Sequence, residues 1–183
     1  MSWQGRKSSS EYFNGSSKLR VRLLDVGRAL RQNHALEHAT IAVLLKRLDR
    51  KVRLLGYTSP GGYYIFGAIP TETLEQSAKD ALRQLREGKE DLAVSSMCGT
   101  NLVVAGLAAG MASMIAGRGH SGWSKFSRMA TASMIAAVVA QPLGRLAQKH
   151  ITTDAEQDNV TSIRVMKKGS GRLTRHKVEV LRS

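Results

Sequence analysis

Two long runs without a charged side chain constrain this sequence more than any other feature. Residues 92–117 carry no charge, and neither do residues 129–144. At about 1.5 Å per residue, helices over 97–117 and 129–147 would be roughly 32 and 28 Å long, close to the thickness of a bilayer core. The basic segment RGHSGWSKFSR joins the two runs. The sequence therefore predicts a transmembrane helical hairpin within residues 92–147.

Small residues along the first run predict close helix contacts. Gly106 and Gly110 form a GxxxG pattern, which lets helix backbones approach in a membrane, and we expect homo-oligomers through this face. Trp123 and Phe126 in the connector suit a membrane interface. Because basic residues flank both ends of the hairpin, the charge pattern does not choose its orientation. Alanine and glycine form membrane helices only weakly, so an alanine-rich hairpin buried in a soluble protein is the alternative interpretation.

The overall charge indicates an anionic partner. The 183 residues include 28 lysines and arginines against 14 acidic residues, which gives a net charge of +14. This balance favours anionic membrane lipid as a partner. Aromatic residues make up 5% of the chain, too few for a module that stacks nucleobases, so nucleic acid is disfavoured. A single cysteine excludes a secreted fold held together by disulfides.

The chain before the hairpin predicts helix and strand together. Residues 1–18 are polar and basic, and we interpret them as a disordered arm. The spacing of apolar residues over 19–50 predicts a helix that Gly27 softens or breaks. A TSPGG turn lies between β-prone stretches at 52–57 and 63–68, which is typical of a β-hairpin.

A second helix and a second β-hairpin complete the predicted fold. Residues 70–87 have a helical pattern, with Thr71 as N-cap and Gly88 as stop signal. Alternating residues over 160–166 and 177–181 predict two strands joined through KKGSGR. The predicted fold class is therefore α+β. Its parts are the arm, an N-terminal α+β region, the transmembrane hairpin and a C-terminal β-hairpin region, at 1–18, 19–91, 92–147 and 148–183.

One constellation can carry chemistry, the HxxEH motif formed by His34, Glu37 and His38. Residues i and i+4 of a helix share a face, so both imidazoles can bind one metal ion. Glu37 lies beside them and can take a proton from a metal-bound water. This is the inverted form of the zincin motif. The motif continues an apolar stripe, so the alternative interpretation is a polar cluster satisfied by hydrogen bonds inside the core.

The predicted topology supplies further candidate ligands. If the hairpin spans a membrane, Cys98 and His150 emerge on the face that carries the HxxEH helix. With His34 and His38, either Cys98 or His150 would complete a set of three ligands that suits zinc, with one coordination position open for water. The alternatives are small-residue packing for Cys98 and an interfacial cation for His150.

Other chemistry has no support in the sequence. His120 and His176 have no suitable partners nearby, and we expect both to be solvated. No P-loop, dinucleotide-binding or nucleophile-elbow pattern occurs.

Five segments between residues 28 and 167 form a distinctive set: NHALEHAT at 33–40, GYYIFG at 62–67, CGTNL at 98–102, QPLG at 141–144 and HITT at 150–153. Together they resemble an uncharacterised family of bacterial membrane proteins described only as a domain of unknown function. The resemblance implies two helices crossing the bacterial inner (plasma) membrane. It supplies no activity.

A narrower resemblance links His34, Glu37 and His38 to the pitrilysin and insulin-degrading peptidases. It implies two zinc ligands and a general base at these positions. The chain departs from that family because residues 92–153 contain no glutamate to serve as a downstream ligand, and because it is too short for paired α/β domains. This resemblance therefore supports a metal role and not peptidase identity.

The sequence as a whole predicts an integral membrane protein with a metal-dependent, peptidase-like hydrolase site. Glu37 is the expected catalytic residue, and His34, His38, Cys98 and His150 are the expected zinc ligands. The alternative is a non-enzymatic membrane scaffold that binds anionic lipid or protein partners through its basic surface.

Overall fold

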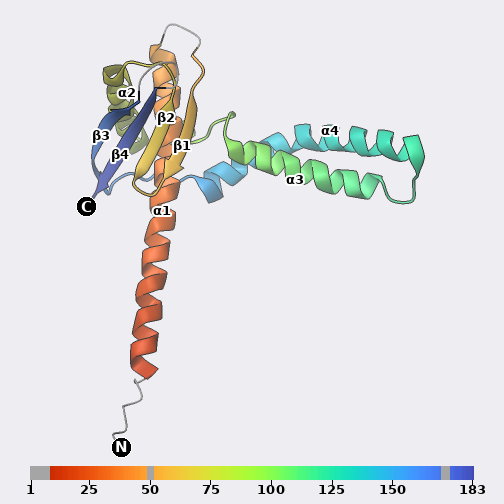
Figure 1. The fold of residues 1–183 in the computed structure, drawn as a ribbon, viewed down its shortest axis with the longest axis horizontal. Coiled ribbons are helices and arrows are strands. Elements are labelled where there is room, and N and C mark those ends of the chain that lie inside the picture. The colour runs from red at the N-terminus through yellow and green to blue at the C-terminus, as the bar shows by residue number, and fades with distance from the viewer. Residues whose placement is uncertain (1–8, 49–51, 170–173) are drawn as a thin grey trace, which may run out of the picture.

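The computed structural model describes residues 9–48, 52–169 and 174–183. Its elements in chain order are α1 (Ser9–Arg47), β1 (Leu55–Ser59), β2 (Gly62–Phe66), α2 (Thr71–Arg86), the 3₁₀ turn η1 (Glu90–Ala93), α3 (Gly99–Ala116), α4 (Gly122–Ala147), the π-helical turn η2 (Gln148–Thr152), β3 (Val160–Lys168) and β4 (Arg175–Arg182). Figure 1 shows an α/β body, from which the first half of α1 and the α3–α4 hairpin project in different directions. The α+β fold class predicted from the sequence is confirmed.

The body is a four-stranded antiparallel sheet with α1 and α2 packed on one face (Figure 1). The strand order is β1-β2-β4-β3, so the two predicted β-hairpins join through β2 and β4. Alternate residues of β4 point toward the helices, and Val178 and Val180 are buried there. They share one apolar core with Leu36 of α1 and Leu74 of α2. This core unites chain segments that the hairpin separates in sequence.

α1 is one continuous helix of 39 residues. Gly27, expected to soften or break it, lies inside the helix in open space, because a Cβ placed there meets nothing within 4 Å. The expected disordered arm is helical from Ser9 onward, while residues 1–8, and Arg50 at the predicted helix end, lie outside the described residues. Leu23 is 64% exposed, whereas Leu36, Val43 and Leu44 of the second half are buried. The described residues of α1 that belong to the core lie in that second half.

α2 begins at Thr71 without a side-chain cap. Pro70 occupies the N-cap position, so the prediction of Thr71 as the N-cap is wrong. The Thr71 hydroxyl lies instead 3.1 Å from His176 Nε2. His176 was expected to be solvated but is fully buried on the helix-covered face of β4, and burial lowers the pKa of its imidazole. Gly88 follows the helix with a positive φ of 83°, as a stop signal requires.

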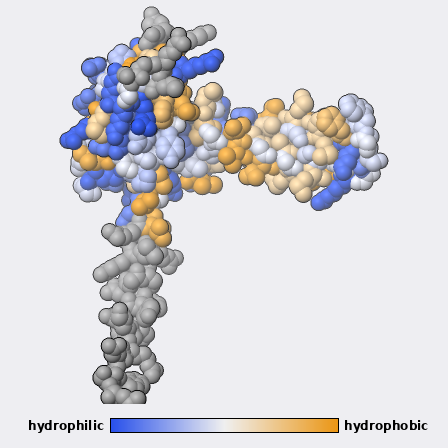
Figure 2. All heavy atoms as spheres, viewed as in Figure 1, coloured by the Kyte–Doolittle hydropathy of each residue, from blue (hydrophilic) through white to orange (hydrophobic). Residues whose placement is uncertain are grey.

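α3 and α4 form the predicted hairpin, and Figure 2 shows apolar residues over most of its visible surface. Both helices are long and apolar enough to cross a membrane, and only 6% and 11% of their apolar windows are buried. A core helix of a soluble protein would be mostly covered. Trp123 and Phe126 lie on the first turns of α4 rather than in a loop, with ring centroids 5.2 Å apart.

The GxxxG face does not mediate the contact between α3 and α4. A Cβ built on Gly106 or on Gly110 meets nothing within 4 Å. The helices contact elsewhere, where Ala105 is buried and Ser133 Oγ donates to the Ala109 carbonyl at 3.2 Å. The two glycines therefore lie on an outward surface of the hairpin.

A buried polar cluster closes the hairpin where it joins the body. Gln148 Nε2 donates to Asn101 Oδ1 at 2.7 Å, and Gln148 Oε1 accepts from the Ser95 backbone N–H at 2.9 Å. Asn101 Nδ2 donates to the carbonyls of Ser95 and Ser96. A Cβ built on Gly144 would overlap Asn101 Oδ1. These contacts fix the loop before α3 against the end of α4.

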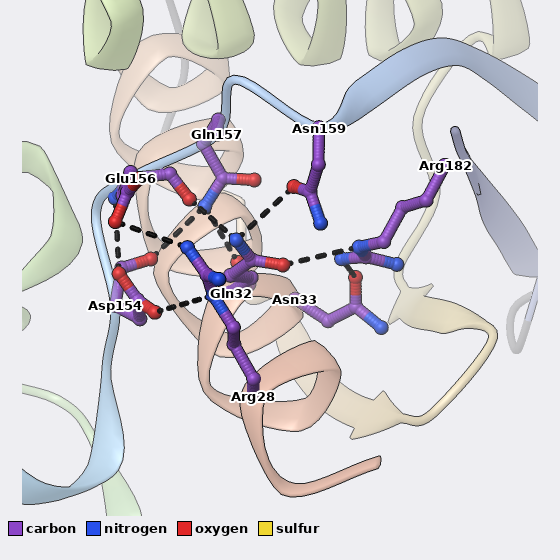
Figure 3. Close-up of polar contacts among 8 residues, drawn as sticks. All are labelled: Arg28, Gln32, Asn33, Asp154, Glu156, Gln157, Asn159 and Arg182. Carbon is purple, nitrogen blue, oxygen red and sulfur yellow. Dashed lines mark hydrogen bonds and ion pairs between the residues drawn. The ribbon is translucent and has the colours of Figure 1, made fainter. Parts of the chain in front are cut away.

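A second polar network ties the chain that returns from the hairpin to α1 (Figure 3). Gln157 Nε2 donates to the Gln32 carbonyl at 3.1 Å, and Gln32 Nε2 donates to the Glu156 carbonyl at 2.7 Å. Arg182 Nε of β4 donates to Gln32 Oε1 at 3.1 Å. Gln32 and Gln157 are each only 1% exposed. Because unpaired buried amides are costly, this network sets the register between α1 and the returning chain.

We expect Gly144→Ala to destabilise the base of the hairpin. The added methyl group overlaps Asn101 Oδ1, and overpacking of this kind costs about 1–3 kcal/mol. Gly27→Ala is the matched control, since it adds the same group to open space on α1. Thermal unfolding in detergent should show a lower Tm for Gly144→Ala alone. Equal Tm values for the two variants would contradict the tight packing.

Candidate metal centre

Three side chains from two distant segments meet beside the sheet. His34 and His38 lie one turn apart on the second half of α1, with ring centroids 4.4 Å apart. Cys98 occupies the N-cap position of α3. One potential ligand atom from each of the three lies within 4.8 Å of the other two, and Cys98 Sγ is 3.3 Å from His34 Nε2. The structure thus brings Cys98 to the HxxEH motif, as expected from the topology.

Backbone carbonyls orient both imidazoles. His34 Nδ1 lies 2.9 Å from the Thr152 carbonyl oxygen, and His38 Nδ1 lies 2.7 Å from that of Ala93. Since a carbonyl oxygen only accepts, each Nδ1 carries the hydrogen, and in a neutral ring each Nε2 then presents a lone pair. Metal-binding histidines are held in this way, with the far nitrogen bonded to a carbonyl or carboxylate.

The surroundings of Cys98 favour its thiolate form. Burial raises the pKa of the thiol, but hydrogen bonds involving His34, His38 and Thr100 outweigh burial and bring the pKa to about 5. The Thr100 backbone N–H donates to Sγ at 3.4 Å, in the first turn of α3. Burial also lowers the pKa of His34, yet its contacts with Cys98 raise it above the ordinary value overall. A thiolate can accept from His34 Nε2 only when that imidazole is protonated, so without a metal ion these contacts favour a thiolate–imidazolium pair.

Glu37 lies next to the three ligands, and β1 holds its carboxylate. Thr58 Oγ1 donates to Glu37 Oε2, and a Cβ built on Gly56 would overlap Glu37 Oε1. Only glycine at position 56 leaves room for the carboxylate. Burial raises the pKa of Glu37, partly opposed by the Thr58 hydrogen bond and by the charges of His38 and His34. Glu37, which the sequence indicated as catalytic, is therefore held in place by β1 and has a raised pKa.

The cluster opens into a groove of about 900 Å³ bounded by α1, β1 and the segment before α3. Its polar groups include the cluster itself, with Arg31 and Arg53 also on the wall. Most of the remaining surface is apolar and comes from Leu30, Ile41, Leu45, Leu54, Leu55 and Met97. A ligand with apolar side chains can therefore reach the three candidate metal ligands and Glu37.

His150 does not join the other expected ligands. It is exposed on η2 and lines a separate surface hollow. Its segment reaches the cluster through the Thr152 carbonyl, which accepts from His34. Among the described residues, the ligand group contains the two HxxEH histidines and the cysteine, without His150 or His120.

The residues that position the cluster were not predicted from the sequence. Thr152 and Ala93 act through backbone carbonyls, so their side-chain types carry no signal. Thr58 lies in a turn-flanking stretch that is ordinary for a β-hairpin. Gly56 had a usable signal, because an isolated glycine in a strand pattern often marks the close approach of another group.

The charge state of Cys98 can be tested directly, since it is the only cysteine of the chain. In metal-free protein, we expect alkylation by iodoacetamide to remain fast down to about pH 5 and to slow below it as the sulfur takes up a proton. His34→Ala removes the main stabilising hydrogen bond, so the decline should move upward toward the ordinary pKa of 9.0. Mass spectrometry gives the rate at each pH.

His120→Ala is the control for that experiment, because His120 is the one imidazole of the hairpin connector and lies outside the cluster. It should retain the wild-type profile. An unshifted profile for His34→Ala would show that this imidazole does not stabilise the thiolate.

Comparison with known proteins places the chain in a family. Residues 29–165 match a domain of unknown function, DUF6391. An uncharacterised protein of Picosynechococcus sp. is 35% identical over 137 residues, an alignment that covers 68% of this chain and 65% of the relative. The match thus spans just under two thirds of that relative's length. No solved structure matches the chain. This protein belongs to the DUF6391 family.

Proposed function

We propose that this chain is a membrane-bound, metal-dependent hydrolase with a peptidase-like site. The observation that carries the proposal is the convergence of His34, His38 and Cys98, with the Nδ1 atom of each imidazole already bonded to a carbonyl. The groups directed inward are then two imidazole nitrogens and a thiolate. Zinc accepts this donor set in tetrahedral sites, and catalytic sites leave the fourth position for water.

The distances support zinc as the ion. Neighbouring nitrogen and sulfur ligands of a tetrahedral zinc ion lie about 3.3–3.6 Å apart. Cys98 Sγ and His34 Nε2 are already 3.3 Å apart, and all three ligand atoms lie within 4.8 Å of one another. Small side-chain movements would therefore bring the three ligand atoms to the spacing of a tetrahedral site.

Glu37 is the chain's own acid–base group in this proposal. A zinc ion held by His34, His38 and Cys98 would supply an acidified water and would polarise a substrate carbonyl. The Glu37 carboxylate accepts the proton of the attacking water and returns it to the leaving group. Burial raises the pKa of Glu37, which brings it closer to neutral pH and suits it to both transfers. Thr58 and Gly56 keep the carboxylate in place during them.

We also propose that α3 and α4 cross the bacterial inner membrane as a two-helix anchor. Their large apolar side chains point outward; Leu102 is 77% exposed and Val138 is 71% exposed. The 18 residues of α3 extend about 27 Å, close to the bilayer core. Arg118 and Lys125 near the tip and Lys149 at the base would bind anionic head groups. The outward GxxxG face of α3 would pair two copies.

Elemental analysis of the purified protein tests the metal site. We expect about one zinc per chain in the wild type, and loss of zinc in His34→Ala/His38→Ala and in Cys98→Ser, because each removes a ligand. Glu37→Gln should keep zinc and lose turnover, since it retains the shape of the side chain but not its basicity. His150→Ala is the matched control and should keep both, because His150 lies outside the cluster.

Zinc-free protein that stays folded would refute the hydrolase proposal. The polar cluster would then be a structural element of the core, and the non-enzymatic scaffold with a basic surface would be the better account. Loss of zinc in His150→Ala would instead show that the bound state recruits a fourth ligand from η2.

Membrane insertion is tested by washing membranes from expressing cells with alkaline carbonate. An inserted hairpin keeps the chain in the pellet, because its apolar surface has no other cover among the described residues. A control without residues 97–147 should be released into the supernatant. Release of the full chain would mean that a protein partner, rather than lipid, covers α3 and α4.

A further inference from the structure

β1 is an edge strand of the sheet, and one side of its backbone pairs with no other described strand. Within the described part of the chain, its neighbour in the sheet is β2. The Gly67 N–H donates to the Thr174 carbonyl, and the Val180 N–H donates to the Gly61 carbonyl. The backbone N–H and C=O groups of the odd-numbered residues from 61 to 67 therefore face β4. Residues alternate between the two neighbours of a strand, so the even-numbered residues of β2 face β1.

The register then shows which backbone groups of β1 face outward. Tyr57 is opposite Tyr64, an even-numbered residue of β2, so Tyr57 bonds inward to the sheet. The N–H and C=O groups of Gly56 and Thr58 consequently point away from the sheet. These are the same two residues that hold the Glu37 carboxylate.

The free edge of β1 runs along the groove of the candidate metal centre. Leu55, Gly56, Tyr57 and Thr58 all line that groove. Side chains of consecutive strand residues point to opposite faces of a sheet, so four in a row line one groove only when the groove follows the strand edge. Leu55 and Tyr57 are 67% and 64% exposed, which leaves the edge open to a ligand.

The two edges of the sheet differ in how well they are protected against pairing. On the far edge, β3 has an irregular register between Val160 and Ser162 and carries Arg164, Lys167 and Lys168. Bulges and charges of this kind prevent a further strand from adding. β1, with the sequence LGYTS, pairs regularly with β2 and has no charge and no proline. An unprotected edge that borders a reactive cluster is suited to receiving a strand.

We propose that the substrate of this site is an extended polypeptide segment with apolar side chains, which adds to the sheet as a strand along β1. This rests on the proposed hydrolase function. The outward groups of Gly56 and Thr58 bond to the substrate backbone, and the apolar groove takes its side chains. The scissile carbonyl then lies by the cluster of His34, His38 and Cys98. Water adds its oxygen to the carbonyl carbon, the C–N bond breaks, and Glu37 passes the proton to the amine.

Peptide binding to inactive full-length protein tests the proposal without relying on turnover. The protein is Glu37→Gln in detergent, and the probe is a fluorescein-labelled octapeptide of alternating valine and serine, capped at both ends. A second probe has the same sequence with every amide N-methylated, so it cannot donate to a strand. Fluorescence anisotropy should show binding of the first probe and at least about tenfold weaker binding of the second.

Two substitutions at one position provide the matched protein variants. Thr58→Pro removes the outward N–H, and an edge strand tolerates proline at a position of this kind. Thr58→Ala removes only the hydroxyl. Placed in the Glu37→Gln background, Thr58→Pro should bind the octapeptide at least about tenfold more weakly than Thr58→Ala. The Tm of each variant shows that the difference does not come from unfolding. If Thr58→Pro is unfolded, the N-methylated probe alone decides.

Equal binding of the two probes, or no binding of either, would overturn the strand-pairing proposal. Displacement of both probes by phosphatidylglycerol would assign the groove to an acyl chain instead. Zinc is measured in the same samples, so the two proposals fail separately. If zinc-free protein binds the octapeptide but not its N-methylated form, the hydrolase proposal is refuted and the polypeptide site stands. If zinc-loaded protein binds neither probe, the polypeptide site is refuted and the hydrolase proposal stands.

Discussion

The docking of the returning chain onto the second half of α1 is the contact on which the rest of the structure depends. The Gln32 and Gln157 side chains bridge the two segments inside the core, and the Asp154 N–H donates to the Arg31 carbonyl at 3.1 Å. Arg28 adds ion pairs with Asp154 and Glu156 at the exposed rim (Figure 3). Because these bonds have specific partners, they fix a register that apolar packing alone would leave free to slide.

The same docking builds the candidate metal centre, because the cluster lies where the hairpin leaves and rejoins the body. Cys98 caps the first hairpin helix, and the Thr152 carbonyl comes from the turn that ends the second. The Gln148–Asn101 hydrogen bond holds these two ends together. The hairpin therefore contributes a thiolate and an orienting carbonyl from its two ends, even though its helices lie outside the body. A disturbance of its base would reach the cluster through either end.

The periodic elements could be predicted from the sequence, whereas contacts between distant segments could not. Apolar spacing indicated α1 from residue 19 onward, the long runs without charge indicated the hairpin, and β-prone or alternating stretches around turns indicated both pairs of strands. His176 was expected on an exposed strand, yet β4 turns that side toward the helices, and only the sheet order reveals it. The prediction of Thr71 as the N-cap of α2 was wrong because Pro70 occupies the N-cap position and the Thr71 hydroxyl bonds to His176. His150 illustrates the same limit: its side chain lines a separate hollow, while the carbonyl of Thr152, two residues later, bonds to His34 in the cluster.

The balance of donors and acceptors separates the two polar clusters of α1. Around Gln32, the amide donates to the Glu156 carbonyl and to Asn159 Oδ1 and accepts from Arg182, and among the described residues of that network only Gln157 Oε1 lacks a partner. Around His34 the inventory is different. The Nδ1 hydrogens are used by carbonyls, and a thiolate, two imidazole nitrogens and the Glu37 carboxylate are left to share a small volume. Thr58 donates to Glu37 and the Thr100 N–H donates to Cys98, and the acceptor positions that remain require protons or a cation. A zinc ion would satisfy three of these groups at once. The Gln32 network thus holds two segments of the fold together, whereas the His34 cluster lies beside an open groove.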